Sequence, residues 1–281
     1  ADGYALAADV FHPAGPPRAA ALVAPAMGVR RGFYAPLARY LAEAGVVALS
    51  LDYRGMGESR PASLRGFPAR LRDWGEQDLA AGVAELSRRA PGAPLLWVGH
   101  SVGGQLLGLL PEAPVRAAVF LGSQSGWSGH WRGAGRAVMA TVWWAFIPAS
   151  TAVAGYLPMR ALGQGEDVPA GVAREWASWG RHRRYIGRYA DAAGGLGFAR
   201  YAGPIRSYAF SDDAYAPPAA CAGLLALYQR ARTELRVVRP ADLGARSLGH
   251  FEPLRERFRD ALWREMRDWL LAAATDDGRQ L

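Results

Sequence analysis

A serine at the junction of a predicted strand and a predicted helix is the best candidate for a nucleophile in this chain. The apolar segment 95–98 (LLWV) leads directly into GHSVG at 99–103, and apolar residues of helical character follow. A serine on so tight a turn needs neighbours without a Cβ atom two positions before and after it, which Gly99 and Gly103 provide. The pattern therefore predicts a reactive hydroxyl on Ser101.

His250 is the histidine whose position suits a general base for this serine. It follows the last predicted strand and precedes the last predicted helix, so its loop emerges at the carboxyl edge of the sheet, as does the loop of Ser101. The other four histidines lie near the end of the first strand, beside the serine or in the middle of the chain: His12, His100, His130 and His182. Position therefore selects His250.

Two aspartates stand where a carboxylate that orients His250 would be expected. Asp212 and Asp213 follow the predicted strand 205–210, whose carboxyl end lies at the same edge of the sheet. Aspartates in turns also cap helices and hold loops, so we expect one of the two to have that structural role. The residues alone leave the choice open.

The elements that position these residues alternate between strand and helix. Strands are expected at 5–11, 19–23, 46–51, 95–98, 115–121, 205–210 and 235–238, and helices at 33–44, 73–89, 105–110, 218–231 and 251–273. This order with short connections is typical of a mostly parallel sheet covered by helices on both faces. The chain has 281 residues and is 51% hydrophobic, enough for one large core. We therefore predict an α/β core formed by residues 1–122 and 202–281.

The segment 123–201 interrupts this alternation, and it contains six tryptophans and no expected strand. Its uncharged run 137–159 is long enough for a membrane span, but Pro148 and Pro158 interrupt it and small polar residues dilute it. We therefore expect no stable membrane span but a pair of helices that covers a hydrophobic pocket. The candidates for the pocket wall are tryptophans: Trp143, Trp144, Trp176 and Trp179.

Composition argues against several other classes of function. The net charge of +8 rests on 33 arginines without a lysine, and they are scattered rather than gathered into a stripe, so nucleic-acid binding is not expected. The single cysteine, Cys221, permits no internal disulfide and, with no leader at Ala1, indicates a cytoplasmic protein. We expect neither a metal nor a cofactor, because no metal-ligand spacing and no dinucleotide fingerprint is found.

Taken together, these features resemble the α/β-hydrolase superfamily. The order Ser101, aspartate, His250 is that of the family, and the segment 123–201 lies where the family places a helical lid, before the strand that precedes the catalytic aspartate. The sequence DYRGMGES at 52–59 is similar to the D-x-R-G-x-G-x-S loop of the lipase and serine-aminopeptidase-like branch. The resemblance covers essentially the whole core, and it extends to bacterial predicted α/β hydrolases.

The resemblance implies roles for further residues. The family's catalytic aspartate is usually followed by a proline four positions later, which selects Asp213 over Asp212. The oxyanion hole would consist of the backbone amides of Met27 and Val102. Where the family often has His-Gly in the oxyanion loop, this chain has Pro-Ala at 25–26, which alters the shape of the loop.

The chemistry implied is acyl transfer through an acyl-enzyme, in which His250 takes the proton of Ser101 and Asp213 holds the imidazole. We expect a serine hydrolase that cleaves a small ester or thioester with an apolar acyl group. A peptidase, an amidase or an acyltransferase would use the same triad, and a non-catalytic ligand-binding protein would share the fold. The oligomeric state is not predicted.

Overall fold

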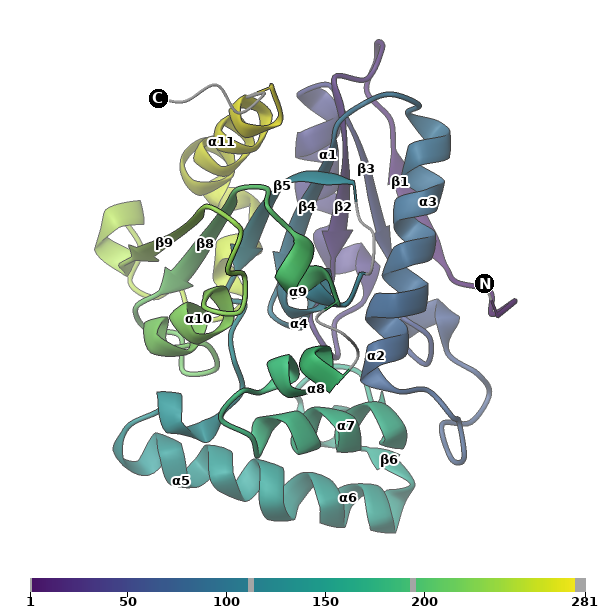
Figure 1. Ribbon diagram of the computed structural model, residues 1–281, viewed down its shortest axis with the longest axis vertical. Helices are drawn as coiled ribbons and strands as arrows, with labels where there is room; N and C mark the ends of the chain where they lie inside the picture. Colours follow the sequence, from purple (N-terminus) through teal and green to yellow (C-terminus); the bar gives the residue numbers. More distant parts are fainter. Residues whose placement is uncertain (1, 111–113, 193–195, 276–281) are drawn as a thin grey trace.

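Seven strands form a central sheet within the described residues 2–110, 114–192 and 196–275 of this computed structural model (Figure 1). The strand order is β1-β3-β2-β4-β5-β8-β9. The bounds are β1 Ala8–Phe11, β2 Ala19–Ala24, β3 Val46–Leu51, β4 Leu95–His100, β5 Val115–Leu121, β8 Ile205–Phe210 and β9 Thr233–Val238. Only β1 in this sheet runs antiparallel to its neighbour, so the expected mostly parallel sheet is confirmed.

Helices cover both faces of the sheet because its central strands are apolar on both sides. β2, β3 and β4 are buried at every position, as strands between two helical layers must be. One face packs against α1 (Ala35–Glu43) and α11 (Arg264–Thr275). The other packs against α3 (Ala80–Arg89), α4 (Val102–Gln105) and α10 (Pro218–Leu225). Neighbouring residues of β4 alternate between the two cores, with Leu96 in the first and Trp97 in the second.

Residues 123–201, called the insertion below, fold mainly as helices in their described part, and most of these helices lie at the end of the sheet toward which the central strands point (Figure 1). α5 (Gly133–Thr141), a π-helical turn (Val142–Phe146) and α6 (Ile147–Ala154) follow one another without a break. Then come α7 (Ala170–Gly180), α8 (Ile186–Ala192) and α9 (Leu196–Arg200). The two-residue strands β6 (Tyr156–Leu157) and β7 (Val168–Pro169) pair between α6 and α7.

Several expected elements differ in the structure. Most of the run 137–159 belongs to one helix from Gly133 to Ala154 rather than to a pair. Pro148 is accommodated inside it because a π-helical turn at 142–146 shifts the backbone hydrogen bonds just before it, and the carbonyl of Trp143 accepts a hydrogen bond from Arg181. The pair β6–β7 lies in a segment expected to hold no strand. The helix expected at 251–273 becomes α-helical only at Arg264, after a series of shorter turns.

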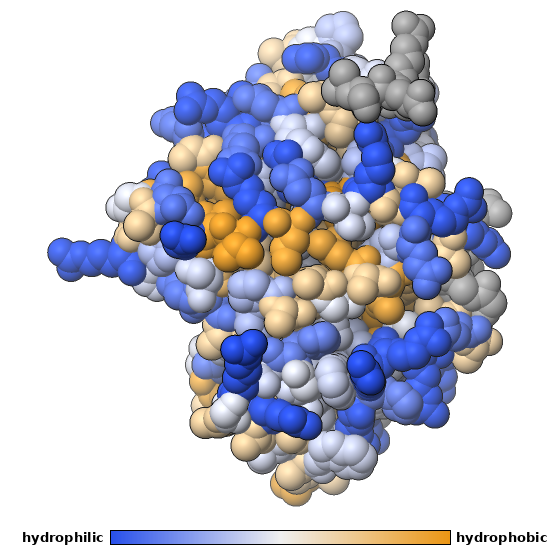
Figure 2. Space-filling model, turned by 60° about the vertical axis from the view of Figure 1, so that its left-hand side comes forward, coloured by the Kyte–Doolittle hydropathy of each residue, from blue (hydrophilic) through white to orange (hydrophobic). Residues whose placement is uncertain are grey.

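The surface is chemically mixed, which agrees with the scattered arginines of the sequence. Figure 2 shows the side of the molecule that carries β9. Hydrophilic side chains cover much of this side, and a band of hydrophobic residues crosses its middle. The hydrophilic side chains are spread over this view rather than gathered into one stripe.

Candidate active site

Ser101 lies on the sharp turn between β4 and α4. Its φ is 52° and its ψ is −118°, a backbone conformation that residues other than glycine rarely adopt. A Cβ atom on Gly99 would lie 2.4 Å from the Cα of Gly104, and one on Gly103 would lie 2.1 Å from the carbonyl oxygen of Ala24. Both glycines of the motif are thus required by the close approach of strand and helix, for the steric reason that the sequence suggested.

His250 and Asp213 form a buried hydrogen-bonded pair beside this turn. Nδ1 of His250 lies 2.6 Å from Oδ2 of Asp213. The other carboxylate oxygen of Asp213 accepts hydrogen bonds from the amides of Tyr215 at 2.8 Å and Ala216 at 3.1 Å, which fix its orientation. Because Nδ1 is engaged by the carboxylate, Nε2 is the ring nitrogen left for acid–base chemistry.

Asp212 has a different set of partners from Asp213. Its carboxylate accepts hydrogen bonds from the amides of Leu248 at 2.9 Å and Gly249 at 3.1 Å, and from the hydroxyl of Ser247 at 3.0 Å. Burial opposes ionisation, but these hydrogen bonds outweigh it and lower the pKa of Asp212 below its usual value. Asp212 therefore holds the turn that leads into His250, while Asp213 contacts the ring.

His100, next to the serine, is buried and connects three loops. Its Nε2 lies 2.9 Å from the backbone oxygen of His250, and its Nδ1 lies 2.8 Å from the hydroxyl of Tyr34. That hydroxyl also accepts a hydrogen bond from the amide of Ala26 at 2.8 Å. A carbonyl can only accept, so Nε2 of His100 carries the proton and Nδ1 accepts from Tyr34. Burial, and then the neighbouring His250, lower the pKa of His100 well below its usual value, so the ring is neutral.

The amides of Met27 and Val102 belong to residues that border the same cavity as Ser101 and His250. Val102 opens α4, and the first amides of a helix have no acceptor within the helix. In the described part of the chain, neither amide has a hydrogen-bond acceptor. The loop of Met27 is held from behind by the hydroxyl of Tyr53, which donates to the carbonyl of Pro25 at 3.0 Å. Both amides are therefore free to bind an oxygen that carries negative charge.

The cavity between the insertion and the carboxyl end of the sheet measures about 80 Å³. This is far below the roughly 300–1,000 Å³ of pockets that enclose drug-sized ligands. The hydroxyl of Tyr215 in the core donates to Oε1 of Gln164 in the insertion at 2.5 Å, and both residues line the cavity. Most other lining residues are apolar: Ala26, Met27, Val102, Gly126, Trp131, Met139, Trp143, Met159, Trp176 and Phe251.

Comparison with known proteins places the chain in a family. The family model described as serine aminopeptidase, S33, matches residues 15–161, which is more than half of the chain and includes Ser101. The protein belongs to this family of α/β hydrolases. None of the curated proteins matches the hydrolase in sequence.

Solved structures of lipases and esterases share the fold of the hydrolase. The monoacylglycerol lipase of Paleococcus ferrophilus has a TM-score of 0.65 at 15% identity, covering 96% of this chain and 99% of that one. A thermostable carboxyl esterase of Bacillus coagulans has a TM-score of 0.64 at 13% identity, with 96% and 94% covered. Est1E of Butyrivibrio proteoclasticus, solved with ferulic acid, has a TM-score of 0.61 at 14% identity, with 97% and 96% covered.

Of the four tryptophans predicted for the pocket wall, only two line the cavity of the hydrolase. Trp143 and Trp176 do so, but Trp144 is 65% exposed on the outside. Adjacent residues of a helix point in different directions, and here Trp143 faces the cavity while Trp144 faces away from it. Trp179 packs against the rings of Tyr185 and Tyr189 instead. The prediction was thus wrong for Trp144 and Trp179.

Other lining residues carried no signal in the sequence. Met139 and Met159 come from separate parts of the insertion, and Gln124 and Gln164 lie in loops. In the sequence, a methionine or glutamine looks the same whether it faces a cavity or the core. Only the fold brings these residues around Ser101.

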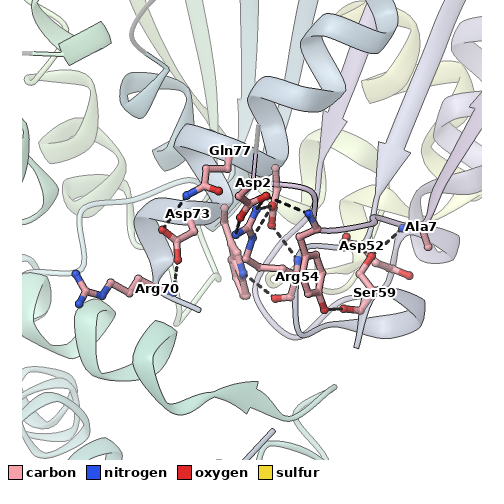
Figure 3. Close-up of polar contacts among 11 residues, drawn as sticks. Asp2, Ala7, Asp52, Arg54, Ser59, Arg70, Asp73 and Gln77 are labelled. Atoms are coloured by element: carbon pink, nitrogen blue, oxygen red, sulfur yellow. Dashed lines mark hydrogen bonds and ion pairs between the residues drawn. The ribbon is translucent and has the colours of Figure 1, made fainter. Parts of the chain in front are cut away.

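The loop 52–59, on which much of the family resemblance rested, supports the core rather than the cavity (Figure 3). The hydroxyl of Ser59 donates to the carbonyl of Asp52 at 2.7 Å and closes the loop. Arg54 donates from Nε to Asp78 at 2.7 Å and from Nη1 to Asp2 at 2.6 Å. Burial raises the pKa of Asp78 to about 6, although the buried Arg54 opposes this shift. The motif is therefore a structural element of the hydrolase.

Proposed function

We propose that this hydrolase is a serine esterase in which Ser101 is the nucleophile, His250 the general base and Asp213 the residue that orients His250. The observation that carries the proposal is that Ser101, His250 and the residues of two free amides border one enclosed cavity, with Asp213 behind His250. A strained serine, an oriented histidine and unpaired amides are the groups that acyl transfer requires.

The proposed reaction has two steps. Nε2 of His250 accepts the proton of Ser101 Oγ as that oxygen attacks the ester carbonyl, and the amides of Met27 and Val102 bind the resulting oxyanion. His250 returns the proton to the leaving alcohol as the C–O bond breaks. Water then attacks the acyl-enzyme with His250 as base, which releases the acid and restores the serine.

The lining of the cavity favours an ester with a short apolar acyl group. A cavity of about 80 Å³ walled by methionine and tryptophan fits a small hydrocarbon chain. No carboxylate side chain of the described residues lines it, so the free amino group of a peptide would find no opposite charge there. Although the family is described as serine aminopeptidase, these two features support an ester. The insertion would then act as the lid over this pocket.

A fluorophosphonate probe tests the nucleophile and the base. We expect the wild type to be labelled, Ser101→Ala and His250→Ala to be labelled weakly or not at all, and the exposed control Ser63→Ala to be labelled like the wild type. Equal labelling of Ser101→Ala would refute the proposal.

Substrate class is tested with p-nitrophenyl esters of increasing chain length and with leucine p-nitroanilide. We expect kcat/KM to be highest for acetate or butyrate and lowest for the long-chain esters and the anilide. A preference for the anilide would replace the esterase by an aminopeptidase, and a preference for long chains would contradict the inference from cavity size.

A further inference from the structure

One helix in the described residues is long and apolar enough to cross a membrane, and it lies on the outside of the molecule. It runs for 22 residues from Gly133 to Ala154, through α5, the π-helical turn and α6, along the edge farthest from the sheet (Figure 1). Only 17% of its most apolar stretch is buried. A core helix with the same composition would be mostly buried. Packing in the core therefore does not explain why this helix is so apolar.

The outward face of this helix is apolar along nearly its whole length. Val153 is 83% exposed, Trp144 65% and Val138 59%. Apart from Gly133 and Arg136 in the first turn, the exposed residues of the helix recur every three or four positions: Ala134, Ala137, Val138, Thr141, Trp144, Ala145, Ala149, Ala152 and Val153. None of these nine is charged, whereas the outer face of a surface helix normally carries charges. We call these nine residues the outer face.

The opposite side of the helix is held by the protein, which argues against a transmembrane position. Trp143, Ile147 and Thr151 are buried. Arg174 of α7 donates to the hydroxyl of Thr151 at 3.1 Å, and Arg181 donates to the carbonyl of Trp143 at 2.7 Å. To cross a bilayer, the helix would have to leave these partners. A position in the plane of a membrane surface keeps them.

The charged residues that flank the outer face along the chain are all arginines. Residues 113–165 include no aspartate or glutamate, while Arg132 and Arg136 lie in and before the first turn of α5. Both arginines are exposed, and no carboxylate pairs with either in the described part of the chain. An anionic surface would complement this charge.

We infer that the outer face binds an anionic lipid surface, with the helix lying parallel to the membrane plane. An exposed apolar stripe with a tryptophan near its middle and arginines at one end is typical of interfacial helices. The positive charge favours an anionic lipid over a second copy of the same basic face. Binding of this kind involves no chemistry at Ser101, so the inference does not depend on the esterase proposal.

Vesicle flotation tests this inference. All variants carry Ser101→Ala so that hydrolysis plays no part, and the vesicles contain phosphatidylcholine with or without phosphatidylglycerol. We expect the parent protein to float with the anionic vesicles and less with the neutral ones. The double variant Val138→Glu/Val153→Glu should bind about tenfold more weakly, because it places two negative charges on the outer face.

Two further variants separate the causes. Val237→Glu, on an exposed valine of β9 outside the insertion, should bind like the parent. Arg132→Gln/Arg136→Gln should lose most of the preference for anionic vesicles. Thermal unfolding confirms that each variant folds.

Three results would overturn the inference. The first is a parent protein that does not float, and the second is a double variant that floats as well as the parent. The third is a dimer, detected by sedimentation, that the double variant dissociates while vesicle binding is absent. In that case the occupant of the outer face is a second copy of the chain.

Discussion

The hydroxyl of Tyr34 lies 2.8 Å from Nδ1 of His100, the residue next to the candidate nucleophile. The same hydroxyl accepts from the amide of Ala26, and the other nitrogen of His100 donates to the carbonyl of His250. One chain of hydrogen bonds thus joins the loop of Ala26, the turn of Ser101 and the loop of His250. Because neither Tyr34 nor His100 lines the cavity, we interpret them as positioning residues.

Removing the hydroxyl of Tyr34 should lower kcat more than it changes KM. Tyr34→Phe leaves the amide of Ala26 and Nδ1 of His100 without a partner, and each unpaired buried group costs about 1–3 kcal/mol of folding free energy. Because these groups hold the loops around Ser101 in place, we expect kcat to fall about tenfold. Steady-state kinetics with p-nitrophenyl acetate measure this. The control Tyr40→Phe alters a buried tyrosine of α1 that is remote from the cavity and should retain the parental kcat. An unchanged kcat in Tyr34→Phe would refute the positioning role.

The two aspartates should differ sharply when each is replaced by asparagine. Asp213→Asn removes the carboxylate that holds Nδ1 of His250, and in serine proteases the corresponding change lowers kcat about 10⁴-fold. Asp212→Asn weakens the turn 247–249 and should lower thermal stability with a much smaller effect on kcat. Ester hydrolysis and thermal unfolding are measured on both variants. A larger loss of kcat at Asp212 would reverse the assignment.

Stability should decline as the pH falls below about 6.5, in part because of His100. The unfolded chain binds a proton at this histidine near pH 6.5, whereas burial keeps the folded ring neutral, so the unfolded state binds more protons. The contribution of His100 is therefore fully present above pH 6.5 and is lost as the pH falls. Urea unfolding at pH 7.5 and pH 5 measures the difference.

The variant His100→Gln should reduce this dependence on pH, and the exposed control His12→Gln should leave it unchanged. If His100→Gln has the same slope of stability against pH as the parent, the neutral state of the buried ring is not the cause.

The ion pair between Arg54 and Asp78 should matter more for folding than for catalysis. Asp78→Ala leaves the buried guanidinium of Arg54 without its buried partner, so we expect a loss of about 3–5 kcal/mol in the free energy of unfolding. Glu85→Ala, which breaks a surface pair with Arg88 and Arg89, should cost less than about 1 kcal/mol. Urea unfolding compares the two. Similar losses in the two variants would show that the buried pair contributes no more to the free energy of unfolding than the surface pair.

The acyl preference should follow the size of the cavity. Met139→Ala removes a lining side chain from the insertion, so the best p-nitrophenyl ester should become longer by a few carbons. Trp144→Ala removes a larger side chain from the adjacent exposed surface and should leave the preference unchanged. A shift in both variants, or in neither, would show that another part of the molecule selects the acyl chain.

The parts of this protein that the sequence determined are those governed by local rules. Strands such as 46–51 and 115–121 were predicted at their observed bounds, because runs of apolar residues between turns identify buried strands. The serine turn was equally visible as a motif, and Gly99 is required by a contact with Gly104 only a few residues away, although the contact that requires Gly103 is with Ala24 of the neighbouring strand. The order of the elements also placed His250 at the edge of the sheet that carries Ser101.

The tertiary structure decided which of two adjacent residues faces the site. Asp212 and Asp213 are neighbours in one turn, and in the sequence only the family's spacing to a proline favoured Asp213. The loop of His250, folded against them, gives the physical difference: Asp213 contacts the ring of His250, and Asp212 accepts hydrogen bonds from the amides of the loop before it. Trp143 and Trp144 are neighbours on one helix, and only packing against the core shows which is inside. The bond between Tyr34 and His100 joins residues 66 apart in the chain. Local patterns specify elements, whereas the direction of a side chain depends on contacts that form only when distant segments pack together.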